Sequence, residues 1–218
     1  MTDLLLVPAL SLASISAQPA PAAQPADDPP RLAQPAPIEV KAAADGPAIP
    51  EKKPQFGDPG FWTINFGGGV AHDFKDATDV VGVIGVSTFI ATSLEFTVEA
   101  GGWYFHQDGP DTGGGSGSFA FRYHWFFGDE NERTRDWSLF VEAGIGLLGA
   151  ANEVPDGGTN FDFLPRLGGG GTVRLDDAGT RLLVSLRWHH ISNARISGDS
   201  DNPSRDGVMI FAGVMVPF

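Results

Sequence analysis

A histidine and a serine near the C-terminus have the types and spacing of a nucleophilic pair. His190 and Ser192 are separated by one residue, so in an extended strand their side chains point to the same face. An imidazole beside a hydroxyl can remove its proton, and the activated oxygen can attack an ester carbonyl where water is scarce. The pair therefore indicates serine-based hydrolysis, while a polar contact at a strand end is the simpler alternative.

The segment around this pair alternates as a membrane-spanning strand would. One face holds Leu182, Val184, Leu186, Trp188, His190 and Ser192, and the other holds Arg181, Ser185, Arg187, His189 and Asn193. In a small membrane barrel the apolar face looks out to lipid and the polar face fills the interior. We therefore expect His190 and Ser192 on the lipid side, at the strand end that meets the lipid head groups.

Eight short runs of β type follow Phe61, each bounded by Gly, Asp, Asn or Pro. They cover approximately residues 61–71, 80–90, 94–105, 117–127, 137–148, 162–175, 180–193 and 207–218. Eight is the smallest usual number of strands in an outer-membrane barrel, and such lengths suit tilted strands that cross a bilayer. The predicted fold is all-β: an eight-stranded antiparallel transmembrane β-barrel.

Composition agrees with this fold and excludes several classes of function. The chain has 29 Gly, 16 Phe, 5 Trp and no Cys, with a net charge of -13. The charge argues against nucleic acid as a partner, and the lack of cysteine removes disulfides and thiolate metal sites. Asp199, Asp201 and Asp206 lack the spacing of a known calcium loop. We expect neither a metal ion nor a cofactor.

The N-terminal part differs in composition from the rest. Residues 1–17 resemble the later parts of a secretory signal peptide, although an ordinary disordered tail is the alternative. Residues 18–59 hold eleven of the 17 prolines, and such a segment cannot bury enough apolar surface to fold, which predicts a disordered linker. Residues 60–218 would then form the barrel.

The predicted barrel has both termini on the periplasmic side. The last run ends on Phe218, as many bacterial outer-membrane barrels do. The outward connections would be His72–Asp79, Gln107–Ser116, Ala150–Phe161 and Ala194–Asp206. The run over 180–193 then points outward, which places His190 and Ser192 at the level of the outer leaflet. Inside, we expect Glu95, Glu99 and Glu142 to pair with Arg122, Arg174, Arg181 and Arg187, because buried charges need partners.

From His190-Ile-Ser-Asn-Ala194 onward, with Asn202-Pro203 and Asp206-Gly207 before a last strand, the chain resembles the lipid A 3-O-deacylase (PagL-type acyloxyacyl hydrolase) family. The specific match covers roughly the last 40 residues, while the upstream barrel is compatible but generic. The resemblance implies an outer-membrane barrel that hydrolyses an ester-linked acyl chain of lipid A. It further implies Ser192 as nucleophile and His190 as general base, with Asn193 and Asn202 helping to stabilise the oxyanion. Backbone N–H groups around Asn193 and Ala194 are alternative oxyanion donors.

The chain departs from the family pattern at the acid. The family carries an acidic residue just after the Gly of the loop, where this chain has Val208 or Met209. Asp206 lies two residues before Val208, so in a strand its side chain faces the same side, and it could take the acid's part from a shifted position. Otherwise His190 and Ser192 would act as a dyad.

The sequence thus predicts an outer-membrane serine esterase, a lipid A deacylase whose partner is lipopolysaccharide. The competing class is a non-catalytic small barrel with a structural or adhesive role. Whether two barrels pair as a homodimer is left open.

Overall fold

The computed structural model describes residues 53–128, 135–198 and 202–218. The expected signal peptide at 1–17 and the linker over 18–52 lie outside the described residues. Contacts divide the chain into Met1–Ile49 and Pro50–Phe218, and the strands described below belong to the second unit. In the described ranges, no helix is long and apolar enough to cross a membrane.

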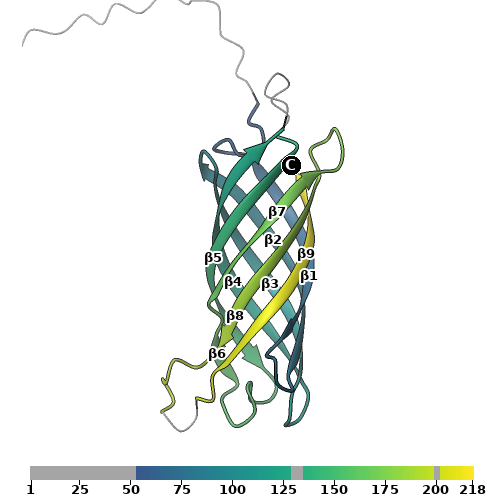
Figure 1. The fold of residues 1–218 in the computed structure, drawn as a ribbon. Coiled ribbons are helices and arrows are strands. Elements are labelled where there is room, and N and C mark those ends of the chain that lie inside the picture. The colour runs from purple at the N-terminus through teal and green to yellow at the C-terminus, as the bar shows by residue number, and fades with distance from the viewer. Residues whose placement is uncertain (1–52, 129–134, 199–201) are drawn as a thin grey trace, which may run out of the picture. The chain divides into compact units, whose positions relative to one another are not determined.

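The described residues form one antiparallel sheet that closes on itself (Figure 1). Its strands are β1 (Trp62–His72), β2 (Thr78–Ala91), β3 (Leu94–His106), β4 (Thr112–Phe127), β5 (Trp137–Ala150), β6 (Phe161–Phe163), β7 (Arg166–Arg174), β8 (Arg181–Ile191) and β9 (Arg205–Pro217). Pairing of β1 with β9 closes the wall. Because β6 and β7 both pair with β5 in one continuous register, they occupy a single position, and the predicted eight-stranded barrel is confirmed.

A proline separates β6 from β7. Leu164 still exchanges backbone hydrogen bonds with Gly146, at 2.8 and 3.0 Å, whereas Pro165 has no N–H to donate to the sheet. The single strand predicted over 162–175 is therefore present as two short strands, β6 and β7, which follow one another along β5. This interruption lies beside the end of β8, where the carbonyl of Pro165 accepts the backbone N–H of His190 at 3.0 Å.

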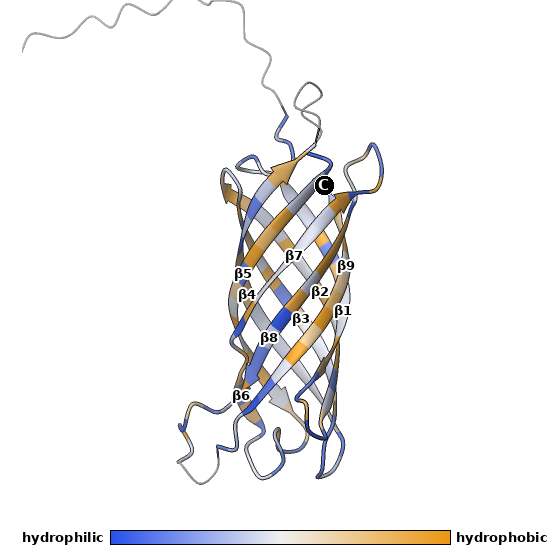
Figure 2. Ribbon diagram, viewed as in Figure 1, coloured by the Kyte–Doolittle hydropathy of each residue, from blue (hydrophilic) through white to orange (hydrophobic). Residues whose placement is uncertain are grey.

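Side chains alternate between the two faces of the wall as predicted. In β8, Val184, Leu186 and Trp188 are 45%, 57% and 38% exposed, whereas Arg181 and Arg187 are buried. Hydrophobic and hydrophilic positions alternate along the strands in Figure 2. An apolar exterior around a polar interior is the arrangement that a lipid bilayer requires.

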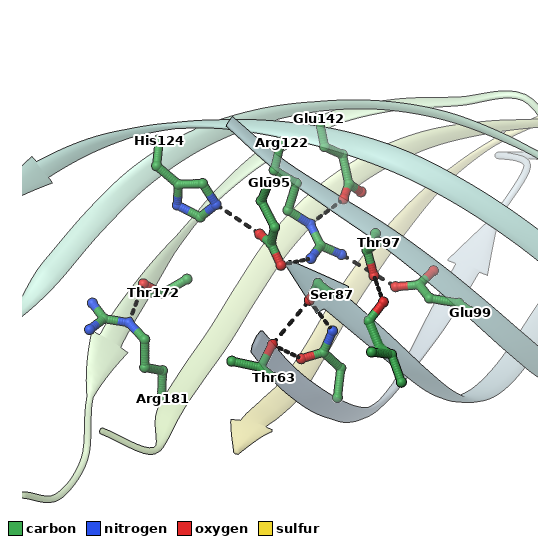
Figure 3. Close-up of polar contacts among 12 residues, drawn as sticks. Thr63, Ser87, Glu95, Thr97, Glu99, Arg122, His124, Glu142, Thr172 and Arg181 are labelled. Atoms are coloured by element: carbon green, nitrogen blue, oxygen red, sulfur yellow. Dashed lines mark hydrogen bonds and ion pairs between the residues drawn. The ribbon is translucent and has the colours of Figure 1, made fainter. Parts of the chain in front are cut away.

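Ion pairs fill the middle of the barrel (Figure 3). The guanidinium of Arg122 donates to Glu142 at 2.8 Å, to Glu95 at 3.2 Å and to Glu99 at 3.3 Å. Arg187 pairs with Glu142, as predicted, and Arg166 adds a contact of 2.7 Å to Glu99 that was not predicted. The buried glutamates are thus neutralised by arginines from facing strands.

Two arginines expected in this cluster lie elsewhere. Arg174 and Arg181 are paired neighbours at the end of the β7–β8 hairpin, too far along the wall to reach the glutamates. Arg174 contacts the exposed Asp177 at 3.1 Å. Arg181 donates to Thr172 at 2.9 Å instead (Figure 3).

A segment before β1 closes the end of the barrel at which the chain enters. The ring of Phe56 is buried among aromatic rings of the wall, with centroids 4.9 Å from Phe89 and 5.4 Å from His124. The guanidinium of Arg181 lies 4.1 Å from the centroid of the Phe56 ring. Residues 53–59, which the sequence assigned to the linker, therefore contact the barrel, because Phe56 finds an apolar pocket there.

Strands β4 and β9 both begin earlier than the sequence indicated. The glycine-rich stretch before residue 117 was expected to be a loop, yet β4 begins at Thr112. A Cβ on Gly114 would lie 2.9 Å from the carbonyl oxygen of Gly149, so glycine is needed for close approach of the two strands. Toward the C-terminus, β9 begins at Arg205 instead of residue 207, which adds two residue pairs with the end of β8, Ile191 with Arg205 and His190 with Asp206.

Candidate active site

The earlier start of β9 pairs Asp206 directly with His190 on β8. Paired residues of antiparallel strands share a face, so both side chains lie on the outside of the wall. The distance from His190 Nδ1 to Asp206 Oδ1 is 2.9 Å. Because a carboxylate only accepts, Nδ1 carries the proton and Nε2 is left with its lone pair. The contact to the carboxylate thus engages Nδ1, and the accepting nitrogen that a general base needs is Nε2.

A tryptophan contacts both members of this pair. The indole N–H of Trp188 donates to Asp206 Oδ1 at 3.0 Å, so this oxygen accepts two hydrogen bonds. The rings of Trp188 and His190 are stacked, with centroids 5.8 Å apart and planes inclined by 27°. The sequence placed Trp188 on the face of His190 but indicated no role for it. Only the pairing register of β8 with β9 would have revealed the contact.

Ser192 lies just beyond the end of β8 and is held by its backbone. It forms an isolated bridge with Phe163 of β6, in which Phe163 N–H donates to Ser192 O at 2.8 Å and Ser192 N–H donates back at 3.3 Å. The residue is buried. Within the described ranges, no hydrogen bond joins its hydroxyl to His190. Such contacts are often loose before substrate binds.

The two asparagines of the predicted oxyanion site contact each other. Asn193 donates its backbone N–H to Asn202 Oδ1 at 2.9 Å, and its own Oδ1 accepts the N–H of Arg195 at 2.8 Å. Ala194 and Arg195 have φ angles of 52° and 64°, a left-handed conformation that is costly for residues with a side chain. The chain thus turns sharply just after Ser192, and the asparagines hold the turn.

This geometry changes the choice of oxyanion donors. The N–H of Asn193 is already bonded to Asn202. In the part of the chain that the structure describes, no acceptor is bonded to the N–H of Ala194. Asn202 uses its side-chain oxygen on the N–H of Asn193, so its side-chain N–H groups are not engaged in that bond.

On the inner face, the residue before Asp206 is anchored inside the barrel. Arg205 donates to Asp79 Oδ1 at 2.6 Å and to Gln107 Oε1 at 3.3 Å. His189 Nε2 lies 3.5 Å from the other oxygen of Asp79. These groups are all buried. These contacts tie the first residue of β9 to β2 at the mouth of the barrel.

A polar cavity of about 490 Å³ opens at the same mouth. It is lined by loop and strand-end residues, among them Asp73, Lys75, Asp76, Asp108, Asp156 and Asp206. Among its charged lining residues, carboxylates outnumber cations. The cavity therefore differs in character from the apolar outer wall on which His190 lies.

A second histidine–aspartate pair lies on the outer face, at the end of β3. His106 Nδ1 is 2.9 Å from Asp111 Oδ1, and the hydroxyl of Tyr104 donates to Asp111 Oδ2 at 2.6 Å. The residue two positions after His106 is Asp108, so this pair has no serine where His190 has Ser192. It provides an internal control for experiments on the first pair.

Across residues 53–128, 135–198 and 202–218, no group of three or more His, Cys, Asp or Glu side chains is placed to hold a metal ion. Asp199 and Asp201, the other members of the acidic cluster noted in the sequence, lie outside the described residues.

Comparisons with known proteins agree with the barrel fold. The family described as lipid A 3-O-deacylase (PagL) matches residues 67–215. No curated protein matches the chain. Among solved structures, Neisserial surface protein A has a TM-score of 0.53 at 16% identity, covering 72% of this chain and 97% of that one. The outer membrane enzyme PagL has a TM-score of 0.50 at 21% identity, covering 72% and 99%.

Proposed function

This chain belongs to the lipid A 3-O-deacylase (PagL) family of outer-membrane β-barrels, and from that membership we propose that it is a serine esterase of the outer membrane. Its substrate is lipid A, from which it hydrolyses an ester-linked acyl chain. Ser192 is the nucleophile, His190 the general base and Asp206 the acid.

The observation that carries this proposal is the hydrogen bond of 2.9 Å between His190 and Asp206. The family's acid is missing from its usual place after Gly207, and the sequence alone left a dyad open. Pairing of β8 with β9 puts Asp206 opposite His190, so a carboxylate from a shifted position meets the imidazole. This supports a complete Ser-His-Asp set.

The reaction follows from the protonation states. Nε2 of His190 takes the proton of Ser192, and the serine oxygen attacks the ester carbonyl. The imidazolium, stabilised by Asp206, returns the proton to the sugar oxygen as the ester bond breaks. Water then attacks the acyl-serine, gives its proton to His190 and releases the fatty acid, while the serine oxygen recovers a proton.

Two groups of the turn after Ser192 are suited to stabilise the oxyanion. The N–H of Ala194 and the side-chain amide of Asn202 are the donors that the site supports best, since the N–H of Asn193 is engaged. Fixed donors aimed at the developing charge lower the barrier most when water is excluded. The left-handed φ of Ala194 is consistent with a turn built for this purpose.

The experiment compares fatty-acid release from lipopolysaccharide by the purified, refolded chain, three site variants and two control variants. Ser192→Ala and His190→Asn should each reduce turnover by roughly 10³-fold or more. Asp206→Asn should reduce it by about 10- to 10⁴-fold. His106→Asn and Asp111→Asn are the matched controls and should leave turnover unchanged.

Two outcomes contradict the proposal. No release by the unmutated chain from lipopolysaccharide would indicate the non-catalytic barrel. Release that survives Ser192→Ala would assign the reaction to another nucleophile.

A further inference from the structure

We propose that Trp188 is a positioning residue that holds the carboxylate of Asp206 against His190. This inference rests on the proposed function, because it concerns the acid of the same site. The sequence motif begins at His190 and does not include Trp188. Its indole N–H and the imidazole N–H nevertheless reach the same oxygen of Asp206, at 3.0 and 2.9 Å.

Asp206 needs such an anchor because it is exposed. Its side chain is 63% exposed, compared with 23% for that of His190. An exposed aspartate can adopt several rotamers, and water competes with histidine for its hydrogen bonds. A single hydrogen bond to histidine therefore holds it poorly. A second donor to the charged oxygen restricts the carboxylate to the rotamer that faces the imidazole, and hydrogen bonds to a charged group are the stronger kind.

The tryptophan is itself well placed for this task. It lies two residues before His190 on the same face of β8, and its ring stacks on the imidazole at 5.8 Å. One side chain thus fixes the acid by its N–H and supports the base by its ring. A rigid aromatic anchor loses little conformational entropy when it makes these contacts.

A similar arrangement of three residues occurs a second time on the wall. Tyr104 and His106 on β3 both bond Asp111, which directly precedes β4. In both places an aromatic donor, a histidine two residues later and an aspartate of the next wall segment form one unit. The second unit shows that a tyrosine hydroxyl can also bond the aspartate that contacts a histidine two residues later, although it does so through the other carboxylate oxygen.

The alternative role of Trp188 is that of an ordinary aromatic residue at the level of the lipid head groups. Trp188→Phe separates the two roles, since phenylalanine keeps an apolar ring and loses the N–H. If Trp188 holds Asp206, this variant should lower kcat on lipopolysaccharide by about 10-fold with little change in KM, as expected for a lost hydrogen bond to a charged group. Trp188→Tyr should restore most of the loss, and Tyr104→Phe should have no effect.

A double-mutant cycle tests the mechanism. Trp188→Phe should have little further effect once Asp206→Asn has been introduced, because the two residues act through one contact. Equal losses in Trp188→Phe and Trp188→Tyr, or full multiplication of the Trp188→Phe and Asp206→Asn effects, would overturn the proposal.

A measurement without substrate distinguishes failure of this inference from failure of the proposed function. In the refolded, ¹⁵N-labelled chain, the indole N–H resonance of Trp188, assigned by its loss in Trp188→Phe, should shift in Asp206→Asn and stay in place in Asp111→Asn. An unchanged resonance in Asp206→Asn would refute the contact even in an active enzyme. An inactive chain that shows the shift would refute the esterase alone.

Discussion

Replacing Arg205 by methionine should destabilise the barrel more than any change at an exposed ion pair. The substitution keeps an unbranched side chain and removes the guanidinium that bonds Asp79 at 2.6 Å and Gln107 at 3.3 Å. Asp79 is 3% exposed, so its carboxylate cannot regain water. Its remaining contact is His189 at 3.5 Å, which is long for a hydrogen bond.

The expected loss follows from these contacts. Removing one partner of a buried ion pair costs about 3 to 5 kcal/mol, because the other charge is left uncompensated. We expect about 3 kcal/mol for Arg205→Met, at the low end, since His189 is still close to Asp79 and the polar cavity begins at Arg205. Asp79→Asn combined with Arg205→Met should recover more than half of this loss, because the unpaired charge is gone.

Equilibrium urea unfolding of the refolded chain in lipid vesicles, followed by tryptophan fluorescence, measures the difference. Arg174→Met is the control, because Arg174 pairs with the fully exposed Asp177 and exposed pairs contribute little. If Arg205→Met unfolds at the same urea concentration as Arg174→Met, Arg205 does not anchor β9. If the double variant is no more stable than Arg205→Met, the uncompensated charge is not the cause.

Three further substitutions test the interior. Arg122→Met should lower the unfolding free energy by about 3 to 5 kcal/mol or prevent refolding, because three buried glutamates lose a shared partner; urea unfolding measures it. Phe56→Ala should cost about 3 kcal/mol in the same assay, since a buried aromatic ring is lost. Gly170→Ala should block refolding, judged by gel mobility, because a Cβ would overlap the carbonyl of Val184, whereas Gly102→Ala, with open space around its Cβ, should fold normally.

Much of the barrel could be predicted because lipid imposes a simple rule on every strand. Apolar and polar residues must alternate, and the alternation in residues 180–193 correctly assigned the outer and inner rows of β8. Where glycine replaces the alternating residues, the rule has no signal. The stretch Thr112–Ser116 was therefore taken as a loop, although it belongs to β4.

The partners of buried charges were harder to predict, because pairing depends on depth in the barrel. Parity correctly placed Arg181 and Arg187 on the inner face. It could not show that Arg187 lies level with Glu142, whereas Arg181 is at the end of its hairpin and meets Thr172. Depth follows from the register between strands, which a single sequence does not contain.

The candidate site was limited by the same missing information. His190 and Ser192 could be named from the alternation of the strand and a short motif. Asp206 could be named because it is the nearest carboxylate to the family's acid position and faces the same side of the strand as Val208. The contact of Asp206 with His190, and that of Trp188 with both, depends on β9 starting two residues earlier than the pattern suggested. The roles of these residues in catalysis stay predictions until the variants are assayed.

The first two residues of β9, Arg205 and Asp206, link the stability of the barrel wall to the geometry of the candidate site. Arg205 points into the barrel and is bonded to β2 through Asp79, while the next residue, Asp206, points outward to His190. Adjacent residues of a strand must face opposite sides, so anchoring the first inside orients the second outside. We therefore expect Asp206 to serve as the acid only while Arg205 keeps the start of β9 paired with β8. We therefore expect Arg205→Met, assayed where it is still folded, to lose activity as Asp206→Asn does, although Arg205 lies on the opposite side of the wall from the substrate.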